Sequence, residues 1–216
     1  MAMMRRQENV WDRDYRHRGR LWSKNVIGFP EVLHGKSVLE AGAGSGKTLR
    51  TILEQGPSKV VAIDFSAEAI RICETAFEDS AVVSFGKADI TALPFEDAAF
   101  DAVVTYYVLD NLLLHGREDA VGEVRRVLKP GGLVLFEDFA VGDFRERTGN
   151  VEKMIEPHTP LKKNGLVCHY FYKEEVMALF KGFVLNNFLV REFNPIRGRN
   201  HMVRRIIRAM FERPIH

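Results

Sequence analysis

The chain has 216 residues, of which 46% are hydrophobic and 28% are charged, and its formal net charge is +2. These values are typical of one globular domain, and no apolar run approaches the roughly 20 residues that would cross a bilayer. The N-terminus lacks the apolar stretch of a secretory signal, and Cys73 and Cys168 lie far apart without metal-ligand spacing. We therefore expect a cytoplasmic protein with reduced thiols, no membrane segment and no bound metal.

Positive charge is concentrated at the two ends of the chain. Residues 1–20 contain six arginines and carry +3, residues 191–216 contain seven and carry +5, and the remainder carries −6. Basic ends of this kind can favour an anionic partner, although arginine-rich termini are more often solvent-exposed faces. Two short basic ends therefore do not establish nucleic-acid binding.

Short apolar runs alternate with amphipathic stretches over the first two thirds of the chain, as they do in successive βαβ units. The expected strands are Ser37–Glu40, Lys59–Ile63, Val82–Phe85, Phe100–Thr105 and Leu133–Asp138. Helices are expected over about Lys47–Gln55, around the apolar stripe Ala69–Phe77 and around Val121–Leu128. Pro130-Gly131-Gly132 is expected to separate the last helix from the last strand.

The pattern changes after Asp138. Residues 141–168 are polar and contain prolines, so we expect a long, irregular surface insertion there. A helix over Lys173–Lys181 and two closing strands, Phe183–Arg191 and His201–Ala209, should follow, with a loop over Asn194–Arg199 between the strands. The segment His201–Phe211 is equally compatible with a helix.

The most informative segment begins at Glu40, where a short apolar run ends and three glycines follow at alternate positions. Glycines in this place allow a tight turn and the close approach of a ligand at the N-terminus of the next helix. Three types of loop fit. Ala41–Thr48 is a permissive phosphate-binding P-loop, and Gly42 and Gly44 begin a dinucleotide fingerprint whose third glycine is replaced by Lys47. The third type is the E-x-G-x-G-x-G loop of class I S-adenosylmethionine-dependent methyltransferases.

Downstream motifs favour the third type. Asp64 ends the second expected strand 22 positions after Gly42, as a ribose-binding carboxylate would. Gly86–Ile90, Leu93–Val103 and Leu128–Leu133 then follow in order, and a P-loop protein gives no reason for them. Together with the glycine loop, these segments resemble the ordered motifs of class I methyltransferases, and in particular the small stand-alone methyltransferases of domain families 11 and 25.

This resemblance implies an α/β fold with a Rossmann-like, doubly wound, seven-stranded sheet that is mostly parallel and has an antiparallel C-terminal strand. It implies S-adenosyl-L-methionine as the cofactor, an N-terminal helical lid over residues 1–34 and a methyltransferase domain over residues 35–216 with its insertion at about 141–168. The residues that it places at the cofactor are Glu40, Gly42, Ala43, Gly44, Gly46, Asp64, Phe65, Asp89, Ile90 and Tyr106, with Trp11 and Tyr15 from the lid. Core packing is the alternative role for Phe65 and Ile90, and a docked surface helix is the alternative to the lid.

The implied activity is transfer of a methyl group to a small-molecule acceptor by in-line displacement, which an enzyme catalyses mainly by positioning. For this reason the sequence singles out no catalytic residue with certainty, and the candidates are Asp110, Tyr106 and His169. Tyr107 and Asn111 would line the acceptor pocket. The alternatives are an RNA (tRNA) methyltransferase, whose binding would weaken steeply with salt, and a non-catalytic cofactor-binding protein. The acceptor, the methylated atom and the oligomeric state stay open.

Overall fold

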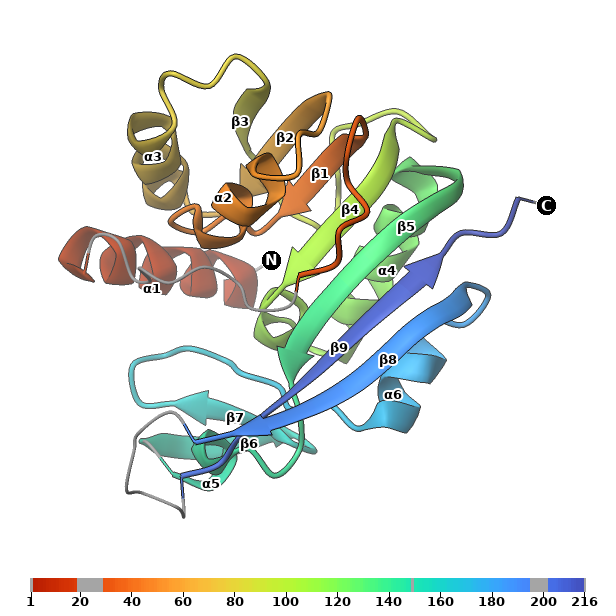
Figure 1. Cartoon of the computed structure of the whole chain (residues 1–216). Helices are drawn as coiled ribbons and strands as arrows, with labels where there is room; N and C mark the ends of the chain where they lie inside the picture. Colours follow the sequence, from red (N-terminus) through yellow and green to blue (C-terminus); the bar gives the residue numbers. More distant parts are fainter. Residues whose placement is uncertain (1, 19–28, 149, 195–201, 216) are drawn as a thin grey trace.

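The computed structural model describes residues 2–18, 29–148, 150–194 and 202–215. Within these ranges the chain forms a seven-stranded sheet with helices on both faces and a two-stranded sheet at one end (Figure 1). The helices are α1 (Ala2–Arg18), α2 (Lys47–Leu53), α3 (Ala67–Ala76), the short 3-10 helix η1 (Leu109–Asn111), α4 (Leu114–Val127), α5 (Phe144–Arg147) and α6 (Lys173–Leu179). The strands are β1 (Ser37–Ala41), β2 (Lys59–Asp64), β3 (Val83–Lys87), β4 (Phe100–Tyr106), β5 (Leu128–Phe139), β6 (Val151–Glu156), β7 (Thr159–Lys162), β8 (Val184–Phe193) and β9 (Arg204–Glu212).

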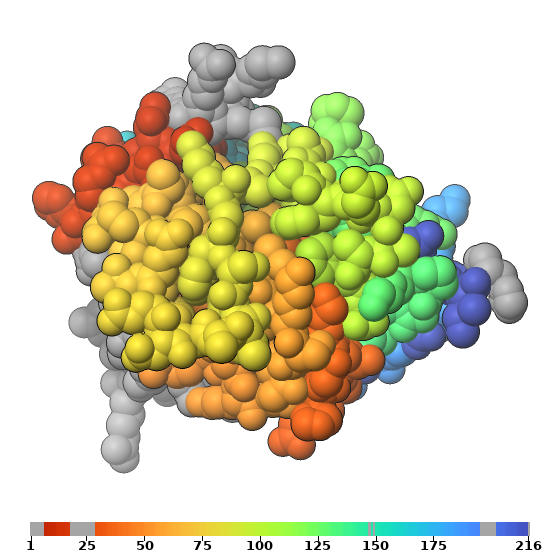
Figure 2. All heavy atoms as spheres, turned by 90° about the horizontal axis from the view of Figure 1, so that it is seen from above, coloured from red at the N-terminus to blue at the C-terminus, as the bar shows by residue number. Residues whose placement is uncertain are grey.

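The large sheet has the order β3-β2-β1-β4-β5-β9-β8, and among these seven strands only β9 runs opposite in direction to the others. The predicted doubly wound, mostly parallel sheet with an antiparallel C-terminal strand is therefore confirmed. In the view from above, the colours run from orange and yellow through green to blue across the molecule, as this strand order requires (Figure 2). The order reverses between β1 and β4, where the carboxyl ends of parallel strands leave a crevice for a ligand.

Neighbouring residues of β1 show why the central strands have apolar residues at adjacent positions. Val38 packs with side chains of α2 and α3 on one face of the sheet, and Leu39 packs with side chains of α4 on the other. Both are fully buried. A strand with helices on both of its faces has no solvent side, so its sequence is a continuous apolar run.

The start of β5 differs from the expectation. We expected it at Leu133, but the strand begins at Leu128. Its pairing with β4 is interrupted: Leu128 pairs with Phe100, and Leu133 pairs with Ala102, so four residues of β5 bulge out of the ladder. Gly131 has a φ of +75° within this bulge, a conformation that glycine adopts without steric cost. The Pro-Gly-Gly segment thus interrupts the ladder inside the strand and does not precede it.

The insertion was expected to be irregular, and this expectation was wrong. It contains α5 and the antiparallel hairpin β6–β7. The two prolines that suggested an irregular segment are compatible with the hairpin, because Pro157 lies in its turn and Pro160 lies in a short strand of a two-stranded sheet. His158 has a φ of +55° in the same turn.

The two ends of the chain follow the expectation only in part. β8 and β9 are the closing strands, so the helical alternative for the last segment is wrong. Residues 2–18 of the expected lid are helical, whereas residues 29–34 are not. Residues 19–28 of the expected lid and residues 195–199 of the expected loop lie outside the described residues. No helix in the part of the chain that the structure describes is long and apolar enough to span a membrane.

Candidate cofactor site

The glycine loop connects β1 to α2 at the carboxyl edge of the sheet. Gly42 and Gly44 have φ values of +83° and +55°. A Cβ atom on Gly42 would collide with the side chain of Val108, and one on Gly44 would lie 2.8 Å from the hydroxyl oxygen of Tyr15. The backbone amides of Gly42 and Ala43 donate to the carbonyl oxygen of Ile63, which holds the loop against β2. The loop therefore presents bare backbone at this edge, and two other segments enclose it.

Glu40 lies directly before this loop. It is 2% exposed, and among the described residues no side chain donates to its carboxylate oxygens, although the backbone amide of Leu49 lies close enough to lower its pKa in part. Burial, followed by the nearby charge of Asp64, raises its pKa well above the usual range. An unpartnered buried carboxyl group is unfavourable unless a cation or a donor completes it. The position of Glu40 therefore fits a ligand that carries a positive charge.

Asp64, at the end of β2, fastens the glycine loop. Its Oδ2 accepts from the amide of Gly44 at 2.9 Å, and its Oδ1 accepts from the amide of Ser66 at 2.9 Å. Burial raises its pKa to about 6, and these two amides oppose the shift. Because an ionised carboxylate offers about four acceptor positions, Asp64 can hold the loop and still accept from a ligand.

Helix α1 lies across the carboxyl ends of β1 and β2 (Figure 1). Oδ1 of Asp12 accepts from the hydroxyl group of Ser66 at 2.5 Å and from the amide of Glu68 at 3.3 Å. Glu8 forms an ion pair of 2.5 Å with Lys87 at the end of β3. These contacts attach α1 to the two strands on the outer side of the glycine loop.

The same helix also contacts the insertion. The side-chain amide of Gln7 donates to the carbonyl oxygen of Gly165 at 2.7 Å and accepts from the amide of Val167 at 3.2 Å. Trp11 and Tyr15 stack on the inner face of α1, with ring centroids 5.6 Å apart. The indole N–H of Trp11 is buried and has no hydrogen-bond partner among the described residues. Helix α1 therefore lies over the loop, and the indole N–H of Trp11 is a donor that it leaves without a partner among the described residues.

A second group of polar side chains lies near the carboxyl ends of β4 and β5, beside the middle of the antiparallel strand β9. The hydroxyl group of Tyr107 donates to Oε1 of Glu137 at 2.6 Å, and Arg208 forms an ion pair with Oε2 of the same residue. The Arg208 guanidinium lies 5.5 Å from the ring centroid of Tyr106. The hydroxyl group of Tyr106 is buried without a hydrogen-bond partner among the described residues. Sequence analysis missed Glu137 and Arg208, although an acidic residue near the carboxyl end of a buried strand was a usable signal for the first.

Asp89, Ile90 and Phe65 lie at the ends of β2 and β3. Asp89 accepts from the amide and hydroxyl groups of Thr91 at 2.9 and 2.8 Å, which orders the turn after β3. Ile90 is 7% exposed and packs in the core beside α4, whereas Phe65 is half-buried. The structure therefore brings Asp64, Phe65 and the turn after β3 to the same edge of the sheet.

His169, a candidate from the sequence, lies inside the fold. It is 2% exposed; its Nδ1 lies 2.7 Å from the hydroxyl oxygen of Thr159, and its Nε2 lies 2.8 Å from a carboxylate oxygen of Glu175 of α6. Its ring packs edge-on against Phe171. These contacts join the β6–β7 hairpin to α6, and they direct both ring nitrogens to protein partners.

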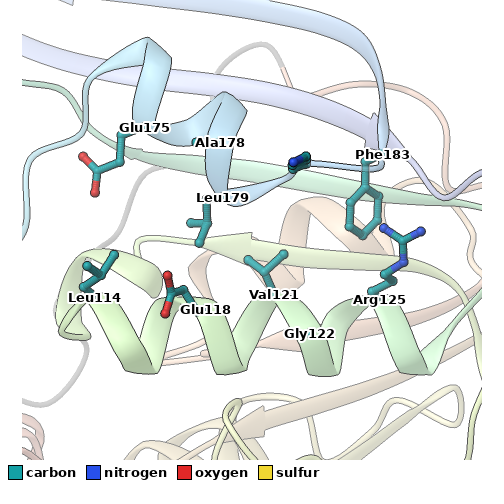
Figure 3. Close-up of a pocket in the computed structure, with 10 residues that line it drawn as sticks. Leu114, Glu118, Val121, Gly122, Arg125, Glu175, Ala178, Leu179 and Phe183 are labelled. Carbon is teal, nitrogen blue, oxygen red and sulfur yellow. The ribbon is translucent and has the colours of Figure 1, made fainter.

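A groove lies on the outer face between α4 and α6, with a cavity volume of about 320 Å³ (Figure 3). Its lining residues are Leu114, Glu118, Val121, Gly122, Arg125, Glu175, Ala178, Leu179, Lys181 and Phe183. No residue that the sequence placed at the cofactor belongs to this set. The groove is therefore distinct from the glycine loop.

A doubly wound sheet with a glycine loop at its carboxyl edge defines a nucleoside-cofactor-binding fold. Residues 39–136 match the methyltransferase-domain family. A tRNA N(3)-methylcytidine methyltransferase of Schizosaccharomyces pombe, trm140, is 26% identical over 199 aligned residues, which cover 83% of this chain and 64% of that protein. The ubiquinone/menaquinone biosynthesis C-methyltransferase UbiE of Stutzerimonas stutzeri is 34% identical over 126 residues, which cover 56% of this chain and 48% of that protein.

A solved structure of an S-adenosylmethionine-dependent methyltransferase from Methanosarcina mazei has the same fold, with a TM-score of 0.75 at 23% identity over 89% of this chain and 100% of that one. The match to a methyltransferase domain thus covers residues 39–136, and the fold is that of a solved S-adenosylmethionine-dependent methyltransferase. It spans 64% and 48% of the length of the two curated relatives.

Proposed function

We propose that this chain binds S-adenosyl-L-methionine, the cofactor of class I methyltransferases, at the glycine loop and transfers the methyl group to a small-molecule acceptor. The observation that carries this proposal is the unpartnered carboxyl group of Glu40 directly behind the bare backbone of that loop. The amino-acid portion of the cofactor carries an ammonium group. This positive charge would give the buried Glu40 carboxyl group the partner that it lacks. The residues present therefore fit the cofactor of the class.

Each of the predicted residues has a proposed role. The backbone at Gly42, Ala43, Gly44 and Gly46 contacts the cofactor, Asp64 accepts from its ribose, Phe65 and Ile90 flank its adenine and Asp89 accepts from the adenine amino group. Tyr106 lies towards its methionine end, and Trp11 and Tyr15 cover it from α1. The free indole N–H of Trp11 and hydroxyl group of Tyr106 support these last assignments, because buried donors without partners are rare.

The bound cofactor supplies a methyl group that its sulfonium already activates. The work of the protein is therefore to orient the acceptor and to exclude water. Contacts between α1 and the insertion support this role, since Gln7 joins the two above the carboxyl edge of the sheet. A helix across this edge of the sheet favours a small acceptor over a macromolecule.

Calorimetric titration tests the cofactor assignment. We expect micromolar binding of S-adenosylmethionine and S-adenosylhomocysteine, and none of ATP–magnesium or NAD. Asp64→Ala should abolish binding and Glu40→Gln should weaken it at least tenfold, whereas Glu74→Gln, the same chemical change at an exposed position of α3, should leave it unchanged. Binding of ATP–magnesium alone would overturn the proposal.

A tRNA acceptor is the second candidate. The fission-yeast relative that aligns with 83% of this chain is named as a tRNA methyltransferase. In addition, the guanidinium groups of Arg145 and Arg204 lie 4.8 and 4.7 Å from the ring centroid of Phe139, near the end of β5. Labelled methyl transfer to a total tRNA pool, compared with transfer to a small-molecule extract, separates the two acceptors. Binding of tRNA should in that case weaken steeply with salt. Cofactor binding without transfer to either pool would favour a non-catalytic cofactor-binding protein.

A further inference from the structure

Two carboxyl groups lie close together at the ends of β4 and β5, and the proposed cofactor contacts use neither of them. Asp138 of β5 is fully buried, and among the described residues its carboxyl group has no side-chain donor, although the backbone amide of Asp110 lies close enough to lower its pKa in part. Asp110 of η1 is 3% exposed, and its carboxyl group lies within hydrogen-bond reach of the Asp138 carboxyl group. Two ionised carboxylates carry no hydrogen, so this contact is a hydrogen bond only when one of the two is protonated.

The two carboxyl groups differ in the donors that surround them. Oδ1 of Asp110 accepts from the side-chain amide of Asn111 at 2.6 Å, and the thiol of Cys168 lies 3.5 Å from its Oδ2. Burial raises the pKa of both carboxyl groups, and the charge of Asp110 raises that of Asp138 further. The proton therefore belongs on Asp138, whereas Asp110, which has donors of its own, is the better place for the negative charge.

The charged and titratable groups around the pair come from several elements. They are Tyr107 beside η1, Glu137 of β5, Arg145 of α5, Lys162 of β7, and Cys168 and Tyr170 of the segment that follows β7. Arg145 favours the ionised form of Asp110, and Glu137 opposes ionisation of Asp138. The surrounding charges therefore favour an ionised Asp110 and a protonated Asp138, as the hydrogen bonds of the pair also do.

Asp110 is also close to the candidate cofactor site. It follows two residues after Val108, whose side chain occupies the space that a Cβ on Gly42 would need. On its other side, the carbonyl oxygen of Asp110 accepts from the amide of His169 at 2.6 Å. Asp110 is therefore held between Val108, which contacts the glycine loop, and the insertion.

We propose that Asp110 and Asp138 share one proton, that ionised Asp110 is the base that takes the proton released by the acceptor, and that Asp138 is a positioning residue that keeps Asp110 ionised. This inference rests on the proposed methyl transfer. When an acceptor atom that carries hydrogen gains a methyl group, its bond to hydrogen breaks and one proton leaves. That proton forms the new O–H bond on Asp110, which becomes neutral and later loses the proton to solvent.

Difference infrared spectroscopy tests the shared proton without cofactor or acceptor. The spectrum of the wild type minus that of Asp138→Asn at neutral pH should contain the carbonyl band of a protonated carboxyl group. A contribution of the Glu40 carboxyl group is common to both proteins and cancels, and Glu40→Gln in a separate subtraction identifies it. Absence of a protonated-carboxyl band in the Asp138→Asn difference would overturn the proposal.

The pH dependence of methyl transfer tests the base. Asp138→Asn keeps a donor towards Asp110 and should leave the acidic limb of kcat/KM within about half a pH unit of its wild-type position. Asp138→Leu has a similar size but no donor, so the limb should move to higher pH by about one unit or more. Asp110→Asn should lower the rate about 10²- to 10⁴-fold on the plateau above the acidic limb and should remove that limb. Binding of S-adenosylhomocysteine and thermal unfolding show that each variant is folded.

The outcomes separate the two proposals. A purely structural role for Asp138 predicts equal losses in Asp138→Asn and Asp138→Leu with an unmoved limb, and this result would overturn the inference while the methyl transfer stands. Absence of transfer by the wild type with every acceptor pool would overturn both.

Discussion

The hydroxyl oxygen of Tyr15 lies 2.8 Å from the point that a Cβ atom on Gly44 would occupy, so α1 and the glycine loop touch with no room for one more carbon atom. The amide of Gly44 donates on its other side to Asp64. Gly44 is therefore held between a helix near the N-terminus and the end of β2. Any change in the loop is transmitted to the helix that covers it.

Gly44→Ala tests this relationship. The substitution places a Cβ at a φ of +55°, which costs about 1–2 kcal/mol in backbone strain, and it pushes Tyr15 away. We expect affinity for S-adenosylhomocysteine to fall at least tenfold in calorimetry. Gly122→Ala in α4 is the matched control, because nothing lies within 4 Å of its added Cβ. The control should gain about 0.5–1 kcal/mol of stability and keep its affinity; equal losses in both variants would contradict the expectation.

Glu40 should make the ligand-free protein less stable as pH rises. The folded-state pKa is raised above the unfolded one, so the contribution of Glu40 to stability is complete below the unfolded pKa and is lost as pH increases through the folded pKa. A difference of one between the folded and unfolded pKa corresponds to about 1.4 kcal/mol. The free energy of unfolding in urea should therefore decrease with pH more steeply for the wild type than for Glu40→Gln.

Glu74→Gln controls for the loss of one carboxyl group at an exposed position. It should follow the wild-type pH profile. Parallel profiles for the wild type and Glu40→Gln would show that the Glu40 carboxyl group finds a partner in solution.

The ion pair between Glu137 and Arg208 should matter for stability. Glu137 is 3% exposed, and Arg208 is 8% exposed. Arg208→Met leaves the carboxylate buried without its cation, so we expect a loss of about 3–5 kcal/mol in urea unfolding. The double variant Glu137→Gln/Arg208→Met removes the charge as well and should recover a large part of this loss. A double variant as unstable as Arg208→Met would show that packing of the arginine, and not its charge, accounts for the effect.

Gln7 should control how long the cofactor stays bound. Gln7→Ala removes the contacts to the backbone of Gly165 and Val167, both in buried surroundings. Losing buried hydrogen bonds of this kind costs about 1–3 kcal/mol, so release of S-adenosylhomocysteine in stopped-flow experiments should be about 5- to 150-fold faster. Arg13→Ala removes an exposed bond from the same helix to the carbonyl oxygen of Asn164 and should change the release rate less than threefold. Identical rates for the two variants would argue against a lid held by Gln7.

Local sequence patterns predicted most of the large sheet, because a strand buried between two layers of helices has apolar residues at adjacent positions. Val38 and Leu39 are an example. The glycine loop and Asp64 were predicted for the same reason, since each lies at the end of such a strand. The hairpin β6–β7 was not, because Pro157 and Pro160 are as common in irregular segments as in turns and short edge strands.

Partners far apart in the chain were beyond these patterns. Glu137 meets Arg208 across 71 positions, and Gln7 meets Val167 across 160. No periodicity or spacing in the sequence predicts either contact, because only the folded topology brings the two residues together. The Asp110–Asp138 pair was missed for a related reason: Asp110 was a candidate by its place after β4, but its carboxyl partner on the adjacent strand carries no local signal.

The lid helix has its outer attachment at Asp12, beside the end of β2, and its inner attachment at Gln7, on the insertion. A rigid helix held at both points cannot open the crevice on the side of β2 while it stays closed on the side of the insertion. We therefore expect spent cofactor and methylated product to leave through a single opening event. Steady-state kinetics would then show one release step that both products share. Added demethylated cofactor would slow the exchange of the acceptor as well as the binding of fresh cofactor.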